Sequence, residues 1–184
     1  ELGFFEPDRV RADWVAGAAV MPPRAAAQEF MACGHAWGRD HLPADLPARR
    51  LADLVGRIVD GATNADGTST AGLELFRAWS RVPWPDDDPA TALHALHLLR
   101  ELRGGIHVRA AQEAGLDPHT AVIVRAGEGM AALFGWTAPH PDPEPARAAW
   151  DAVEQVTNER AATTLEVLDE AEQAELVDLV RAAL

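Results

Sequence analysis

Proline, glycine and helix-capping residues divide this chain into segments of helical length, and almost no segment has the alternating pattern of a β-strand. Asp88-Pro89 and Asp117-Pro118 each place a capping carboxylate before a proline, which is typical of a helix start. β-branched residues gather at 122–124, but this stretch lies inside a segment that is capped as a helix. These patterns predict an all-α fold.

The same boundaries give the expected helices. Gly38 is expected to end the second helix, and the paired glycines at 104–105 are expected to separate the fifth from the sixth. Asp169, three residues before Glu172, indicates a capping-box variant at the start of the last helix. The expected helices cover residues 9–21, 24–37, 47–60, 70–81, 89–103, 106–114, 118–126, 146–167 and 170–183, with a loop at 61–69.

Length and composition suit a globular chain, with 184 residues of which 48% are hydrophobic. Three regions are predicted to share one compact domain. They are an N-terminal helical region at 1–81, a helix-turn-helix region at 82–137, and a proline-rich linker with long C-terminal helices at 138–184.

The charge of the chain argues against nucleic acid as a partner. The formal net charge is −13, and residues 142–184 hold eleven acidic residues against three arginines. Residues 91–136 hold four of each sign. Because DNA binding gains much of its affinity from cations that displace counterions, DNA is not an expected partner.

Other features indicate a cytoplasmic protein that does not associate with a membrane. No run of 18 apolar residues is present, and no signal-peptide pattern opens the sequence. The single cysteine, Cys33, allows no internal disulfide and suits a reducing compartment. Cys33 is interpreted as a small buried apolar residue, and a catalytic thiol assisted by His35 is the alternative.

The stretch 106–126 has the pattern of a helix-turn-helix. Small residues inside its first helix allow the two helices to approach closely, Gly115-Leu116 forms the turn, and Asp117 caps the second helix. The second helix offers few polar side chains for bases or phosphates, namely His119, Thr120 and Arg125.

The residues around this motif resemble an actinobacterial helix-turn-helix family, the SalK-like family. The resemblance is carried by LLRELRGGIHV at 98–108, Ala-Gly-Leu at 114–116, Gly-Trp at 135–136 and Val-Pro-Trp-Pro at 82–85. The C-terminal helices are similar to the dimerisation helices of MarR-type winged-helix regulators. The resemblance implies a helix-turn-helix architecture and a homodimer, but no secure activity. The wing of such folds is expected to be lost, because Trp136 leads almost directly into alternating prolines.

The fifth expected helix carries His94, His97 and Glu101 on one narrow stripe, while leucines and alanines fill the rest of its circumference. Three interpretations stay open. The stripe could bind a metal, line a ligand pocket together with Trp79 and Trp84, or form a polar edge in which Glu101 pairs with a nearby arginine.

His107, after the paired glycines, is a further candidate for ligand binding or braces the turn. No strict zinc motif is present, so neither a metal nor a cofactor is predicted.

The favoured function is non-enzymatic binding of a natural-product-like small molecule on a degenerate winged-helix scaffold, in actinobacterial specialised metabolism or antibiotic resistance. The first alternative is a MarR-like DNA-binding transcriptional regulator. The second is a small tailoring enzyme that uses the histidines and Glu101 for proton transfer. No nucleophile–base pair, phosphate loop or nucleotide fingerprint favours an enzyme.

Overall fold

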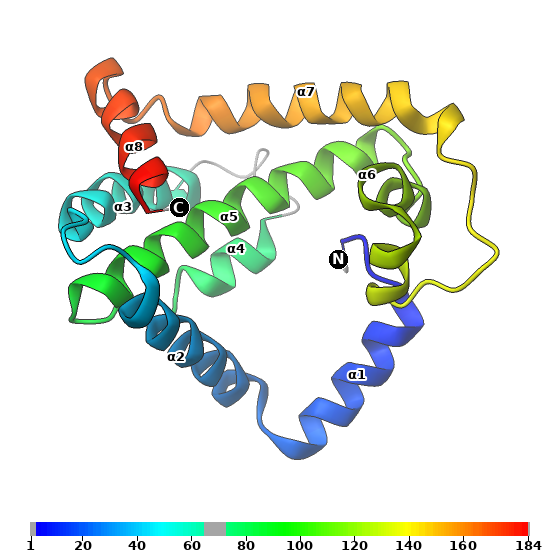
Figure 1. Cartoon of the computed structure of the whole chain (residues 1–184), viewed down its shortest axis with the longest axis horizontal. Coiled ribbons are helices and arrows are strands. Elements are labelled where there is room, and N and C mark those ends of the chain that lie inside the picture. The colour runs from blue at the N-terminus through cyan, green and yellow to red at the C-terminus, as the bar shows by residue number, and fades with distance from the viewer. Residues whose placement is uncertain (1–2, 65–72, 184) are drawn as a thin grey trace. The chain divides into compact units, whose positions relative to one another are not determined.

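The structure, a computed structural model, describes residues 3–64 and 73–183. Every regular element in these two ranges is a helix, which confirms the all-α prediction (Figure 1). The third helix continues to Asn64 and so includes the first residues of the expected loop. The predicted start of the fourth helix at Thr70 lies outside the described residues.

The chain forms two compact units, each built from two stretches of sequence: residues 1–23 with 106–159, and residues 24–105 with 160–184. The first unit contains α1 (Pro7–Val20), α6 (Pro118–Leu133), η1 (Glu144–Ala146) and most of α7 (Arg147–Thr164). The second contains α2 (Pro23–His41), α3 (Ala48–Asn64), α4 (Glu74–Trp79) and α8 (Glu170–Ala182). Helix α5 (Asp88–Glu113) contributes residues to both units.

The prediction that the paired glycines break the fifth helix is wrong, because α5 is one uninterrupted helix (Figure 1). Each glycine inside a helix costs about 1 kcal/mol relative to alanine. The buried side chains of Leu102 and Ile106 lie on either side of the pair, and their burial outweighs that local cost.

The end of α5 and the start of α6 form the predicted helix-turn-helix. Gly115 adopts a φ of +66°, and the Leu116 amide donates to the carbonyl of Ala111 at 3.0 Å, which closes the helix end. The carboxylate of Asp117 then accepts from the Thr120 amide at 2.8 Å, as its position before Pro118 predicts.

The small residues of the motif lie in the core of the first unit. Ala110 and Ala111 are buried against Val153 of α7. At Gly127 a φ of +75° interrupts the helical backbone of α6, next to the predicted end of the second motif helix. Residues 3–64 and 73–183 include no strand, so no wing accompanies the motif in this part of the chain.

Part of the apolar surface of each C-terminal helix is buried within its own unit. Val153 of α7 packs in the first unit, and Leu176 and Leu179 of α8 are buried in the second, where α8 contacts α3. A homodimer stays a prediction.

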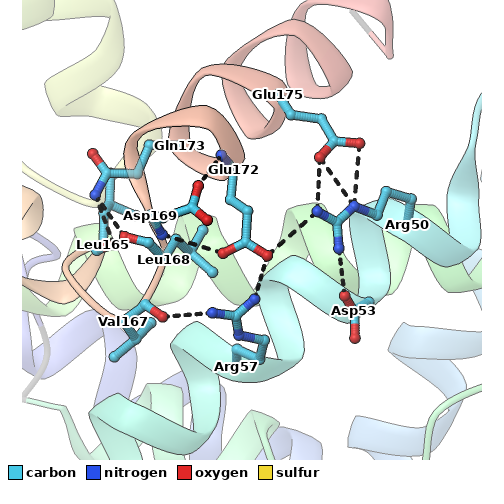
Figure 2. A network of polar contacts seen from close by, with 10 residues as sticks. All are labelled: Arg50, Asp53, Arg57, Leu165, Val167, Leu168, Asp169, Glu172, Gln173 and Glu175. Carbon is cyan, nitrogen blue, oxygen red and sulfur yellow. Dashed lines mark hydrogen bonds and ion pairs between the residues drawn. The ribbon is translucent and has the colours of Figure 1, made fainter.

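A polar network ties α8 to α3 (Figure 2). The guanidinium of Arg50 donates to the Glu175 carboxylate at 3.0 and 2.8 Å, and Arg57 donates to Glu172 at 2.5 Å. Glu172 also completes the capping box with Asp169, which confirms that predicted helix start. Hydrogen bonds from the arginines hold the pKa of both glutamates below the ordinary value of 4.5.

Replacing Arg50 by methionine is expected to lower stability at neutral pH but to matter much less in acid. A carboxylate whose folded pKa is lowered stabilises the fold above its ordinary pKa, and that contribution is lost as the pH falls through the folded pKa. Urea unfolding of wild type and Arg50→Met should therefore give a difference at pH 7 that shrinks toward about pH 3. A difference that does not change with pH would show that Arg50 acts through packing alone.

Candidate functional site

The candidate site lies in the second unit, where α2 and α5 approach closely. Gly34 and Gly38 are one turn apart on α2 and both face Leu93 of α5. A Cβ at Gly38 would lie 3.0 Å from the Leu93 Cβ and 3.0 Å from the Pro89 carbonyl oxygen. The prediction that Gly38 ends its helix is therefore wrong, since α2 continues to His41 and uses this buried glycine for packing.

The glycine contact brings two histidines together, because His35 follows Gly34 and His94 follows Leu93. The Nε2 atom of His35 lies 3.2 Å from the Nδ1 atom of His94. The His94 side chain is fully buried, and the Trp84 ring lies against it with ring centroids 4.7 Å apart.

An ion pair fixes the start of α5 beside this contact. Arg39 of α2 donates to the Asp87 carboxylate at 2.6 Å, and Asp87 accepts from the Ala90 amide at 3.1 Å. The capping carboxylate is thus that of Asp87, one residue before the predicted cap at Asp88. Asp88 itself pairs with Arg49 at 2.5 Å.

One turn along α5, His97 lies in a second aromatic cluster. Its ring lies nearly perpendicular to that of Trp79, with a centroid distance of 4.9 Å and an interplanar angle of 87°. Phe30 of α2 contacts both rings, at 5.8 Å from His97 and 5.3 Å from Trp79. His94 thus lies beside Trp84 and His97 beside Trp79. These are the two tryptophans named with the histidines in the predicted ligand pocket.

The electrostatics of the site favour neutral imidazoles. Burial, together with smaller contributions from the neighbouring His35 and His97, lowers the pKa of His94 from 6.5 to about 4. Burial also lowers the pKa of His97, against the opposing effect of Glu101, and that of His35. The Nε2 atoms of His94 and His97 are buried without a hydrogen-bond partner among the described residues.

The remaining candidates lie apart from these two nitrogens. Glu101 is buried and pairs with Arg100, which is the arrangement expected of a polar edge. His107 belongs to the first unit, where its Nδ1 atom lies 3.0 Å from the hydroxyl of Thr157. Since that hydroxyl donates to the Val153 carbonyl at 2.7 Å, the His107 nitrogen is the donor.

His35 and Phe30 belong to the site but are not predicted as members from the sequence, where His35 is only a possible partner for Cys33. Cys33 is exposed and not buried as predicted. The pattern that could have found His35 is Gly34-x-x-x-Gly38, since small residues one turn apart let helices approach closely. In the part of the chain that the structure describes, no group of three or more potential ligands could hold a metal ion.

Two of the polar side chains that the sequence offers on the second motif helix, His119 and Thr120, make contacts within the chain and are not free to bind DNA. The ring of His119 stacks on Trp136 with centroids 4.6 Å apart, and its Nε2 atom lies 2.9 Å from Nδ1 of His140. The hydroxyl of Thr120 donates to Asp117 at 2.8 Å. Of the three polar candidates on this helix, Arg125 is the exposed one.

The fold and the motif define an all-helical protein with a helix-turn-helix. The model of a helix-turn-helix family matches residues 1–140, and the chain belongs to this family. No curated protein and no solved structure matches the chain. This match supports the helix-turn-helix architecture that the resemblance implies. It gives no evidence for the SalK-like or MarR-type features. None of the described helices combines the length and the apolar character needed to cross a bilayer.

Proposed function

We propose that the second unit binds a planar, natural-product-like small molecule at the imidazole nitrogens of His94 and His97. The observation that carries the proposal is that both Nε2 atoms are buried without a hydrogen-bond partner in the described residues. Each polar group left in this state costs about 1–3 kcal/mol. A ligand that supplies the missing hydrogen bonds would recover this free energy on binding.

The surroundings of the two nitrogens favour an aromatic ligand. Phe30 is 58% exposed and Trp84 is 36% exposed, so aromatic surface reaches solvent directly beside buried polar atoms. Small-molecule sites commonly combine aromatic walls with a few polar groups that fix orientation. Flat rings stack on such walls, and the imidazoles supply the orientation. The cavity expected from the sequence stays a prediction.

Variants of His97 test the proposal. His97→Phe keeps an aromatic ring among Trp79 and Phe30 but removes both nitrogens, so we expect at least about tenfold weaker ligand binding with a thermal midpoint within a few degrees of wild type. His97→Gln places an amide near the position of Nε2 and is expected to retain part of the affinity. Binding is measured by calorimetry against a panel of planar aromatic compounds.

The matched control is His41→Phe, which changes an exposed histidine of α2 that stacks on Trp37 outside this cluster. It should bind the panel like wild type. If His97→Phe instead unfolds the protein, or binds the panel as tightly as wild type does, the imidazole is structural and the proposal fails.

Family membership favours DNA binding as a second candidate function. We nevertheless expect no binding of duplex DNA at physiological salt, because the chain carries a net charge of −13 and both His119 and Thr120 of the second motif helix make contacts within the chain. Fluorescence anisotropy with genomic fragments measures this. Sub-micromolar binding that weakens with added salt would restore the regulator hypothesis.

A further inference from the structure

The His35–His94 contact determines what the buried Nε2 atom of His94 can do. The two facing nitrogens are 3.2 Å apart, so one carries a proton and donates it to the other. If His35 donates, His94 Nδ1 accepts, and the proton of the neutral His94 ring sits on Nε2, which is then a donor. If His94 Nδ1 donates, its Nε2 atom is an acceptor. The state of His35 therefore sets the role of Nε2.

His35 connects this buried nitrogen to the surface. The side chain of His94 is 0% exposed, whereas His35 is only partly buried on α2. A proton can pass between Nδ1 of His94 and Nε2 of His35, which are 3.2 Å apart. The pair has the composition of a two-imidazole proton relay.

The charged groups around the pair do not favour a fixed imidazolium. Arg39 and Asp87 act on His35 with opposite signs and neutralise each other as an ion pair. On α5, Glu101 is likewise paired with Arg100, and His97 also acts to lower the pKa of His94. Burial lowers the pKa of His35, His94 and His97 alike, so the neutral form of each ring is favoured near pH 7.

We propose that the ligand of this site is a hydroxylated planar ring, a phenol or an enol, whose hydroxyl group is bound by His94 Nε2 through the His35–His94 relay. This inference rests on the proposed function and names its ligand class. A hydroxyl both donates and accepts, so it matches a nitrogen that can take either role. The exposed rings of Trp84 and Phe30 offer stacking surface for the aromatic part.

The proposed relay gives a ligand hydroxyl a route by which its proton can leave. The ligand O–H bond breaks as an N–H bond forms at His94 Nε2, and the proton on His94 Nδ1 moves to His35 Nε2. The proton on the outer nitrogen of His35 leaves to water. The balance is phenol to phenolate plus one proton in solvent, with both imidazoles neutral before and after.

The test uses two probes with the same ring, para-nitrophenol and its methyl ether para-nitroanisole, each titrated into the full chain. Absorbance separates the phenol from the phenolate form of the first probe. We expect wild type to bind para-nitrophenol at least about tenfold more tightly than para-nitroanisole, with a gain of the phenolate band. His35→Phe should lose this preference and the band while retaining the weaker binding of the ether.

His35→Gln supplies a second variant, since its amide keeps a hydrogen bond to His94 but cannot relay a proton. It should retain part of the preference for the phenol without the phenolate band. His41→Phe is the control with unchanged behaviour. If both probes bind wild type equally, or if His35→Phe and His35→Gln leave the preference intact, the inference fails and the proposed function stands. If neither probe binds and the wider aromatic panel also fails, both are wrong.

Discussion

Acidification from about pH 6.5 to about pH 4 is expected to remove roughly 3 kcal/mol of folding stability through His94 alone. Its pKa is lowered from 6.5 to about 4 in the folded protein, because burial disfavours the charged ring. The unfolded chain therefore takes up the proton first as the pH falls. The stability contribution is complete above about pH 6.5 and decreases through that window.

Urea unfolding of wild type and His94→Gln across this range isolates the effect, because glutamine does not titrate. The wild-type free energy of unfolding should fall more steeply with decreasing pH, and the two curves should converge in acid. The lowered pKa values of His35 and His97 act in the same direction and remain in the variant. Parallel curves for the two proteins would mean that His94 is not held neutral in the folded state.

Replacing Gly38 by alanine is expected to destabilise the protein by roughly 2–3 kcal/mol, although alanine is the better helix former. The added Cβ would lie 3.0 Å from both the Leu93 Cβ and the Pro89 carbonyl oxygen. The carbonyl belongs to the backbone at the start of α5, so relief requires the two helices to separate. Separation of α2 and α5 would also lengthen the His35–His94 contact. Gly38→Ala should therefore lower both the stability of the protein and its affinity for the ligand.

Gly56→Ala is the matched control. Gly56 lies in α3 of the same unit, and a Cβ there would meet nothing within 4 Å. This substitution should stabilise the protein by up to about 1 kcal/mol through helix propensity. Thermal and urea unfolding of both variants measure the change in the free energy of unfolding at each glycine. Equal effects at the two glycines would contradict the close approach of α2 and α5.

Helix starts were predictable from the sequence because their causes are local. Asp117 caps α6 and Asp169 with Glu172 caps α8, and in each case the interacting groups lie within three residues of one another. The same reasoning placed the cap of α5 one residue late. There the choice of Asp87 over Asp88 is supported by Arg39, which comes from a different helix.

Glycine roles were not predictable in the same way. The sequence cannot tell a glycine that ends a helix from one that lets two helices approach, since the difference lies in the residue opposite. Gly38 meets Leu93 of another helix, while Gly104 lies inside a helix with no neighbour within 4 Å of its Cβ position. Gly115, by contrast, follows a helix and precedes a cap, and it forms the predicted turn.

For the candidate site, the spacing of His94 and His97 on one helix was enough to predict that they share a stripe. Their tryptophan neighbours followed from nearness in sequence. His35 and Phe30 come from α2 and reach the stripe only through the Gly34–Gly38 contact, which requires tertiary structure. His107 is on the same helix as the stripe but belongs to the other unit.

Long-range proton–nitrogen NMR of the full chain with labelled histidines shows directly whether the buried imidazoles of His94 and His97 bind a planar small molecule. Planar aromatic compounds are titrated into the protein while the ring-nitrogen signals are followed. We expect at least one compound to shift the signals of His94 and His97 saturably and to leave that of His107 in place. Ring-nitrogen signals of His94 and His97 that stay unchanged across the panel, in a folded protein, would contradict it.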